Sequence, residues 1–239
     1  MIHTTAWELE RCRARRKAPT PRRHALDMRR TLRQNLRYGG EPLTLAWRRP
    51  KLKRRPLVVI CDVSGSMEHY SRLLLKFVYV LGNCLDNVEA FVFSTRLTRI
   101  TRQIQCGDVD ASLDQVAVSI QDWGSGTRLG EALKTFNYEW GRRLLRRGAV
   151  VLLVSDGLDR GDIDLLEREI ERLQLCCHRL IWLNPLLGST DYQPLARGMR
   201  TALPYVDDFL PVHNLASLEH LGRVLERLGS YPGGAPLRG

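Results

Sequence analysis

Two uninterrupted apolar runs limit the folds open to this chain more than any other feature. They are residues 57–61 (LVVIC) and residues 149–154 (AVVLLV). Strands that are buried on both faces have this pattern, and they occur mainly in parallel sheets whose faces are covered by helices. Residues 70–84 carry apolar side chains at helical spacing. This alternation of strands and helices predicts an α/β fold, a three-layer sandwich with a mostly parallel central sheet.

The remaining periodic segments extend the same alternation. Two expected helices begin after Asp162 and Asn214, whose side chains can accept a hydrogen bond from the first helical turn. Further strands are expected at residues 88–93, 97–104, 180–183 and 205–212, and further helices at residues 110–120 and 128–143.

Charge is distributed unevenly along the chain. The net charge is +11 over 239 residues, yet residues 1–56 contain 17 Lys and Arg against 4 Asp and Glu. The rest of the chain is nearly neutral, with 20 against 22. We expect a basic N-terminal extension over residues 1–55, an α/β domain over residues 56–229 and a flexible tail over residues 230–239. Such an extension favours an acidic partner: a protein, a nucleic acid or an anionic lipid surface.

The basic extension is expected to contain one short helix. Asp27 can cap its start, and Gly39-Gly40 would end it. Residues 1–25 are weakly periodic, and residues 48–55 (RRPKLKRR) are predicted to form a basic linker. The apolar side chains on one face of the helix are those of Met28, Leu32 and Leu36.

Three short polar segments lie where a parallel sheet binds ligands. Residues 62–66 (DVSGS) and 155–157 (SDG) follow the two apolar runs, and residues 124–127 (GSGT) form a Gly-rich turn before an expected helix. In open α/β sheets, ligands bind at the carboxyl ends of strands, near a switch in strand order. The candidate metal ligands in these segments are Asp62, Ser64, Ser66, Thr127 and Asp156.

All five candidate ligands offer oxygen atoms. Carboxylate and hydroxyl oxygens suit a hard divalent cation such as Mg²⁺, or another such as Mn²⁺. Hydroxyl ligands are neutral, so an ion held directly by the two serines and the threonine, with the aspartates acting mainly through water, keeps excess positive charge. An Asp or Glu of a partner can then supply one more ligand. The segments therefore predict protein binding through a metal ion.

The same five residues carry a resemblance to a known fold family. In order and approximate spacing, they are similar to the metal-ion-dependent adhesion site (MIDAS) of von Willebrand factor type A (VWA) domains, over residues 56–229. The resemblance implies the VWA fold, which is a Rossmann-like sandwich. Longer stretches resemble the CoxE-like family more narrowly: LDMRRTLRQNLRYGG (26–40), WGSGTRLGEAL (123–133), SDGLDRG (155–161), IWLNPL (181–186) and LPYVDDFLPVHNLASL (203–218).

The resemblance to the CoxE-like family also implies a function. Those proteins are accessory factors linked to carbon monoxide dehydrogenase and related molybdenum hydroxylases, and their usual partner is a MoxR-type AAA+ ATPase. The resemblance implies a role in the maturation or activation of such an enzyme. CoxE-like chains often have a longer helical region before the metal-binding domain, whereas residues 1–25 precede the first family-like segment here. We therefore expect a shortened member of the family or a displaced start.

The sequence gives little support for a catalytic function. The chain contains no Gly-x-Ser-x-Gly elbow, no P-loop and no Gly-x-Gly-x-x-Gly motif. We expect a protein that is not an enzyme. Two alternatives from other classes stay open: binding of nucleic acid or an anionic surface through the basic N-terminus, and metal-assisted hydrolysis. Nucleic acid is not the expected partner, because Trp7, Tyr38 and Trp47 are the few aromatic side chains that the basic head offers for stacking.

The cysteines and the hydropathy pattern bear on the cellular compartment. None of the six cysteines has the Cys-x-x-Cys spacing of a zinc site. The chain shows no secretory signal pattern and no run of about 18 apolar residues. We expect a reducing, cytoplasmic setting.

Overall fold

The computed structural model describes residues 11–85, 87–105, 126–188, 193–194 and 196–227. Contacts divide the chain into two compact units. The small unit consists of residues 11–54, and the main unit contains residues 55 onward.

The main unit is built around a six-stranded sheet with the order β6-β5-β4-β7-β8-β9. Neighbouring strands are parallel, except for β5 and β6 at one edge. The two apolar runs form the central strands β4 and β7, in which every residue is buried. The expected α/β fold with a mostly parallel sheet is confirmed. The strands are β4 (Leu57–Asp62), β5 (Val88–Phe93), β6 (Leu97–Arg99), β7 (Val150–Val154), β8 (Arg179–Asn184) and β9 (Asp208–Pro211).

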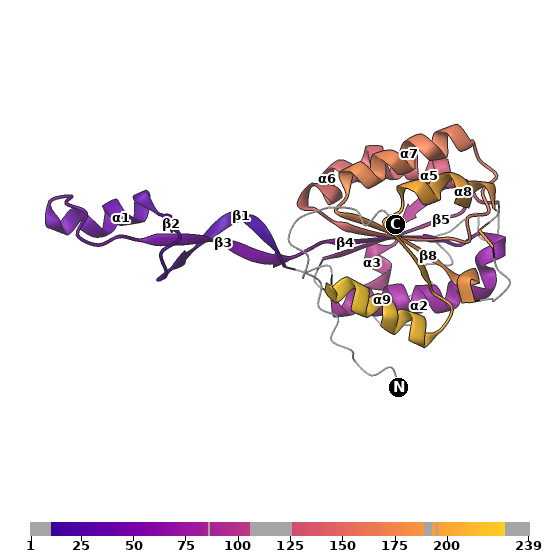
Figure 1. Ribbon diagram of the computed structural model, residues 1–239, viewed down its shortest axis with the longest axis horizontal. Helices are drawn as coiled ribbons and strands as arrows, with labels where there is room; N and C mark the ends of the chain where they lie inside the picture. The colour runs from indigo at the N-terminus through magenta and orange to yellow at the C-terminus, as the bar shows by residue number, and fades with distance from the viewer. Residues whose placement is uncertain (1–10, 86, 106–125, 189–192, 195, 228–239) are drawn as a thin grey trace. The chain divides into compact units, whose positions relative to one another are not determined.

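Helices cover both faces of this sheet (Figure 1). Among the described helices, α2 is the longest with 17 residues, and none is long and apolar enough to cross a bilayer. One layer contains α2 (Glu68–Cys84), α3 (Thr101–Ile104) and α9 (Leu215–Arg227). The other layer contains α5 (Leu129–Thr135), α6 (Arg142–Leu144), α7 (Ile163–Cys176) and α8 (Arg197–Ala202).

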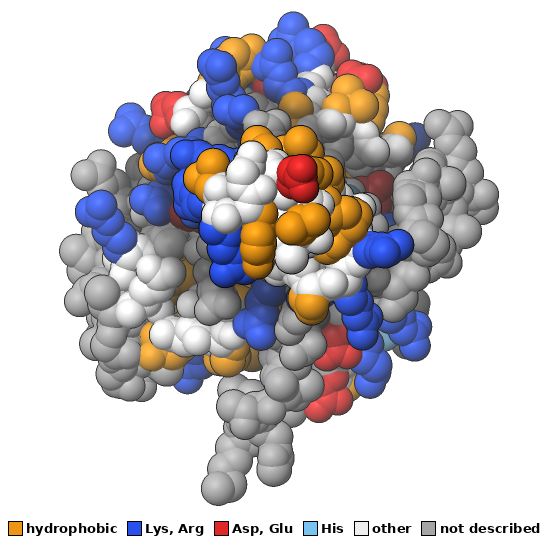
Figure 2. Space-filling model, turned by 90° about the vertical axis from the view of Figure 1, so that its left-hand side faces the viewer, with side chains coloured by type: hydrophobic (Ala, Val, Ile, Leu, Met, Phe, Trp, Pro, Cys, Tyr) orange, Lys and Arg blue, Asp and Glu red, His pale blue; other side chains and the backbone are white. Residues whose placement is uncertain are grey.

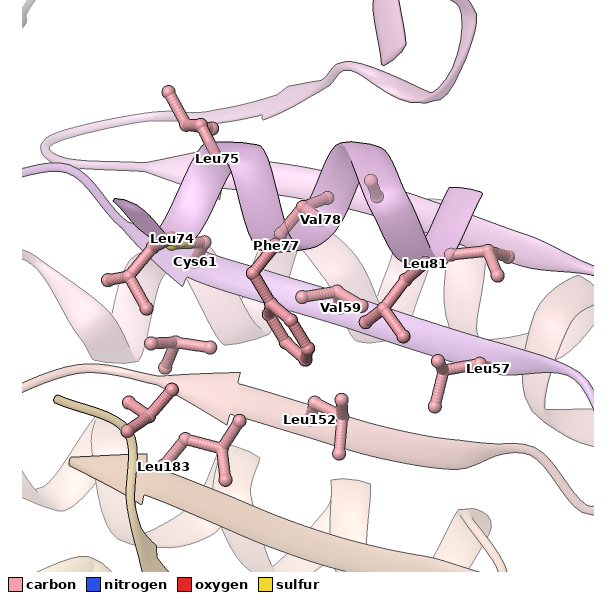
Figure 3. Close-up of a cluster of buried hydrophobic side chains, with 14 of the residues drawn as sticks. Leu57, Val59, Cys61, Leu74, Leu75, Phe77, Val78, Leu81, Leu152 and Leu183 are labelled. Atoms are coloured by element: carbon pink, nitrogen blue, oxygen red, sulfur yellow. The ribbon is translucent and has the colours of Figure 1, made fainter. Parts of the chain in front are cut away.

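A hydrophobic core lies on each face of the sheet, because successive side chains of a strand point to opposite faces. In β4, Val59 and Cys61 belong to the core shared with α2, whereas Val58 and Ile60 belong to the core shared with α5 and α7. Figure 3 shows Phe77 of α2 reaching down beside Val59. Packing from both sides fixes β4, and with it the start of the loop that follows.

The candidate site lies where the strand order reverses. Strand β4 pairs with β5 on one side and with β7 on the other, so the loops after β4 and β7 leave from neighbouring carboxyl ends. A crevice at such a switch point is the usual ligand site of an open α/β sheet. Asp62 ends β4, and residues 63–66 and 155–157 follow the two strands, as the sequence predicted.

Residues 97–104 were expected to form one strand, which is wrong for their second half. Strand β6 ends at Arg99, and α3 begins at Thr101. Ile100 and Ile104 are both buried, and a separation of four residues places two side chains on one face of a helix. The expected helix over residues 128–143 is continuous, with a π-helical segment (Phe136–Gly141) between α5 and α6. The expected helix at residues 110–120 and the tail at residues 230–239 lie outside the described residues.

The small unit contains a three-stranded antiparallel sheet with the order β1-β3-β2. The prediction of a linker over residues 48–55 is therefore wrong, since residues 47–54 pair with β1 from Thr20 to Arg11. Many side chains of β3 are basic and exposed to solvent, so the apolar alternation that marks a half-buried strand is missing. The strands are β1 (Arg11–Thr20), β2 (Ala25–Leu26) and β3 (Trp47–Arg54).

The predicted short helix of the small unit is present as α1 (Met28–Asn35). Asp27 caps it, since its Oδ1 accepts a hydrogen bond of 3.2 Å from Arg30 N. A 3-10 turn follows and ends at Gly39, whose φ of 69° is a left-handed conformation that suits glycine. Asn35 holds the helix to the next segment, because its Nδ2 donates to Thr44 O at 2.7 Å and its Oδ1 accepts from Thr44 N at 3.0 Å.

Candidate metal centre

Asp62 is the last residue of β4 and is fully buried. Its Oδ1 accepts a hydrogen bond of 2.9 Å from Ser64 N, which shapes the loop after β4. Its Oδ2 accepts a hydrogen bond of 2.8 Å from Ser155 Oγ, which belongs to the loop after β7. The carboxylate of Asp62 therefore joins two of the three predicted segments.

Ser64 and Ser66 lie side by side after this carboxylate. Their Oγ atoms are 3.3 Å apart; Ser64 is buried and Ser66 is exposed. Two neighbouring ligands on an octahedral Mg²⁺ with bonds of about 2.1 Å are separated by about 3 Å. The spacing of the two hydroxyls is therefore close to what one ion would need.

The loop after β7 places Asp156 beside the first loop. Asp156 is 2% exposed, and its Oδ1 accepts a hydrogen bond of 3.0 Å from Leu158 N. Ser155 anchors the loop, since its Oγ accepts from Gly157 N at 3.0 Å while donating to Asp62. Its carbonyl accepts from Trp182 Nε1 at 2.8 Å. Ser155 lies in the predicted segment 155–157 but is not one of the five candidate ligands, because a serine that orients another ligand has no sequence pattern of its own.

Thr127 comes from the third segment, two residues before α5. It is 4% exposed, and its carbonyl accepts a hydrogen bond of 3.0 Å from Arg160 N. A Cβ at Gly126 would lie 3.2 Å from Arg160 Cδ, so glycine leaves room for that side chain. Residues 124 and 125 of the predicted segment lie outside the described residues.

One pocket of about 460 Å³ brings these loops together. Ser64, Ser66 and Thr127 line it, whereas Asp62 and Asp156 are buried and are not among its lining residues. In the described part of the chain, no group of three His, Cys, Asp or Glu residues is arranged to hold a metal. A cation at this place would therefore need the hydroxyl oxygens, as the sequence predicted.

Burial makes the charge of Asp62 unfavourable. Loss of solvent raises the pKa of its carboxyl from 3.8 to about 7, and the nearby negative charge of Asp156 acts in the same direction. The hydrogen bonds from Ser64 and Ser155 oppose this rise in pKa. A divalent cation near the two carboxylates would favour their charged forms. The donor set of two carboxylates and three hydroxyls fits a hard cation in both charge and chemistry.

The rim of the pocket contains charged residues that the sequence did not assign to the site. Asp159 lines it, with Oδ1 accepting from Leu129 N at 3.0 Å and from Gly161 N at 3.1 Å. Burial is the main cause that raises the pKa of Asp159. Arg160 and Arg197 also line the pocket and are exposed. Arg197 belongs to α8, far from the three segments in sequence, so only the folded chain reveals its place.

Solved structures of other proteins align with most of this chain. Proximal thread matrix protein 1 from the mussel byssus, in a structure with a zinc-occupied MIDAS motif, aligns with a TM-score of 0.50 and 14% identity over 73% of this chain. The chain spans about half of that protein, 47% of its length. An aerotolerance-related membrane protein from Bacteroides fragilis aligns with a TM-score of 0.45 and 11% identity over 72% of this chain and 97% of its own.

Sequence comparisons identify the family. A search of curated proteins gives no match. The family model described as "VWA domain containing CoxE-like protein" matches residues 1–218, which include the small unit, all three loops of the site and most of the main unit. The chain therefore belongs to the family of VWA domain containing CoxE-like proteins.

Proposed function

We propose that this protein is a non-enzymatic, metal-dependent accessory factor that binds a partner protein through a carboxylate. One observation carries the proposal: Ser64, Ser66 and Thr127 line a single open pocket, next to the buried carboxylates of Asp62 and Asp156. This arrangement leaves a bound cation accessible from outside, which is what a protein partner requires.

The five candidate ligands would hold the ion in two different ways. Ser64, Ser66 and Thr127 would hold it directly, and Asp62 and Asp156 would act mainly through water. When bound, Mg²⁺ or Mn²⁺ supplies an incompletely neutralised charge and an open coordination position for an oxygen atom. Ser155 keeps Asp62 in place through its hydrogen bond of 2.8 Å, so the site is organised before the partner arrives.

The rim of the pocket favours an acidic partner. Arg160 and Arg197 place two positive charges at the mouth, and complementary charge speeds the encounter with an Asp or Glu side chain. Apart from Asp159, whose Oδ1 is engaged by Leu129 N and Gly161 N, the described residues that line the pocket include no His, Cys, Lys or carboxylate that could act as nucleophile or base beside the ion. This composition suits binding better than hydrolysis.

Membership in the CoxE-like family supports the choice of partners. We infer a MoxR-type AAA+ ATPase and a molybdenum hydroxylase of the carbon monoxide dehydrogenase type, in the cytoplasm. The protein would connect the two during maturation or activation of the hydroxylase. The partner's acidic residue would reach the pocket at the ends of β4 and β7.

A pull-down from native extract tests the proposal. Tagged wild-type protein is compared with Asp62→Ala and Ser66→Ala in Mg²⁺ and in EDTA, and the partners are identified by mass spectrometry. Ser66 is exposed, so its substitution should leave the fold intact. Asp164→Ala serves as the control, since Asp164 is an exposed acidic residue of α7. Recovery of an AAA+ ATPase or a molybdoenzyme only with wild type and control in Mg²⁺ would support the proposal, whereas equal recovery in EDTA would contradict it.

Binding of nucleic acid or an anionic surface is the second candidate. It is favoured by the charge of the small unit, since residues 11–54 contain 16 Lys and Arg against 2 acidic residues. Such binding should weaken steeply between about 50 and 200 mM salt, because counterions are released from the polyanion. Metal-assisted hydrolysis would instead appear as Mg²⁺-dependent turnover that Asp156→Ala removes.

A further inference from the structure

Two parallel stripes of side chains run along α1 and the turn after it. Met28, Leu32 and Leu36 form the first stripe, and they are 56%, 51% and 71% exposed. The spacing of four residues places them on one face of the helix. Each is followed by an exposed arginine, so the second stripe consists of Arg29, Arg33 and Arg37. We call these six residues the α1 surface.

The apolar stripe has no partner within the small unit. The helix uses a different side for its own packing, since its buried residues are Thr31 and Asn35. Thr31 Oγ1 accepts a hydrogen bond of 3.0 Å from Ala46 N, and Asn35 binds Thr44. Figure 2, which faces this unit, shows hydrophobic side chains gathered on the surface with Lys and Arg around them.

The basic stripe is also available for a partner. None of the ion pairs within the described residues involves Arg29, Arg33 or Arg37. Arg37 lies 4.7 Å from the centroid of the Tyr38 ring, a cation–π contact that leaves its charge uncompensated. Three arginines one turn apart therefore face solvent along about 12 Å of helix.

We propose that the α1 surface docks an acidic amphipathic helix of a partner protein, without a metal ion. An apolar ridge on the partner would cover Met28, Leu32 and Leu36, as when a helix lies in a groove. Asp or Glu residues beside that ridge would pair with the arginines. This contact uses residues of the small unit alone and does not depend on the proposed metal-bridged function.

Other kinds of binding partner complement the α1 surface less well than an acidic amphipathic helix. A nucleic acid would neutralise the arginines but offers nothing aliphatic to cover three exposed apolar side chains. A second copy of the chain would bring its own small unit, in which 16 Lys and Arg outnumber 2 acidic residues, so the copies repel. On an anionic membrane, the arginines would meet the headgroups, but an eight-residue helix offers little apolar area for insertion.

Binding of a model peptide to the full-length protein in EDTA tests this proposal. The probe is a fluorescein-labelled helical peptide of about five turns, with leucines on one face and glutamates beside them. A second peptide has lysines in place of the glutamates. Fluorescence anisotropy should show binding of the acidic peptide that is at least about tenfold tighter than binding of the basic one.

Matched variants locate the contact. Leu32→Glu and the double variant Arg29→Glu/Arg33→Glu should each weaken binding of the acidic peptide by about tenfold or more. The control is Leu52→Glu, at an exposed leucine of β3 in the same unit. Circular dichroism checks that each variant is folded, and the replaced side chains are exposed, so folding should be retained.

Several results would overturn the proposal. Equal binding of the two peptides, no binding of either, or an equal loss in Leu52→Glu would each do so. Vesicles of phosphatidylcholine and phosphatidylglycerol and a polyuridine RNA are tested beside the peptides. Tighter binding to either than to the acidic peptide would assign the surface to that occupant instead.

Discussion

The central strands of the main unit and strand β3 of the small unit hold their side chains in different environments. Every residue of β4 and β7 is buried, whereas β3 consists of half-buried and exposed residues. Hydrophobic cores on both faces therefore fix the main sheet, while main-chain pairing and the polar contacts of Asn35 hold the small unit. The packed main sheet holds a few side chains in place at its strand ends. The small unit instead exposes the apolar and basic stripes of α1 to solvent. The two units are suited to different kinds of contact.

The largest difference between the two units is expected in the free energy of unfolding when one buried core side chain of the main unit is removed. Trp182 in β8 is fully buried, and its Nε1 donates a hydrogen bond to Ser155 O. We expect Trp182→Ala to lower the free energy of unfolding by about 3–5 kcal/mol, through the cavity and the unpaired carbonyl. Affinity for Mg²⁺ should fall too, because Ser155 orients Asp62. Urea unfolding measures the first effect and calorimetric titration the second.

The matched substitution in the small unit is Leu52→Ala. Leu52 is 59% exposed, so the free energy of unfolding should change by less than about 0.5 kcal/mol. Similar losses in the two variants would break the comparison, since they would mean that β3 is packed as tightly as β8.

The same difference explains how far the sequence could predict the structure. Continuous burial left a continuous apolar pattern in β4 and β7, so their ends and the residues just after them, such as Asp62 and Asp156, could be placed in advance. The solvated strand β3 carries long basic side chains without alternation and was predicted as a linker, and the Arg-rich sequence of β1 was predicted as an irregular segment. The apolar pattern of a segment reflects how deeply that segment is buried. A strand that is only slightly buried therefore has no clear pattern from which it could be predicted.

The candidate site was predicted in the same uneven way. Ser64, Ser66 and Thr127 belong to short motifs next to strands or turns, and the structure brings them into one pocket. Arg197 reaches that pocket from α8, and nothing near it in sequence marks the place. Such residues depend on how distant helices pack, which the sequence pattern of a single segment does not contain.

The pH dependence of stability should sharpen the comparison, because the main unit contains the buried carboxyl of Asp62. Its pKa is about 7 in the folded chain against 3.8 ordinarily, so the folded state holds this proton more firmly than the unfolded state. Without metal, the free energy of unfolding should therefore fall as pH rises from about 4 to 7, by up to about 4 kcal/mol. Asp159, whose pKa is also raised, acts in the same direction. Thermal unfolding across this pH range measures the effect.

Added Mg²⁺ should reverse this loss at pH 7 and have little effect at pH 4, where the carboxyl is protonated. Asp62→Asn is the control, since the amide cannot ionise and most of the slope should disappear. A slope unchanged in Asp62→Asn would mean that other groups cause the pH dependence. The unfolding of the small unit, followed by amide hydrogen exchange, should show little of this dependence.

A polar substitution should affect the small unit alone. Asn35 is fully buried and binds Thr31 O at 2.7 Å as well as Thr44. We expect Asn35→Ala to destabilise α1 against its neighbouring segment by about 1–3 kcal/mol, because buried main-chain groups lose their partners. Amide hydrogen exchange should become faster in residues 28–46, with no change in β4 and β7.

The control for this variant is Gln34→Ala, at the exposed neighbouring position of α1. It should leave hydrogen exchange unchanged. Faster exchange in the main unit of Asn35→Ala would show that the two units unfold together, and the comparison between them would then fail.

The smallest effect is expected at the rim of the candidate metal pocket, where the direction of the change is informative. Arg197 is exposed and lines the pocket, so Arg197→Ala should weaken partner binding by less than about 1 kcal/mol, chiefly through a slower association rate. The same substitution removes a positive charge near the cation and should slightly strengthen binding of Mg²⁺. Arg200→Ala, one turn along α8, is the matched control and should change neither quantity. Surface plasmon resonance at several salt concentrations gives the rates, and calorimetry gives the metal affinity. Opposite changes in the two affinities would assign Arg197 an electrostatic role toward an acidic partner, whereas parallel losses would mean that it supports the pocket itself.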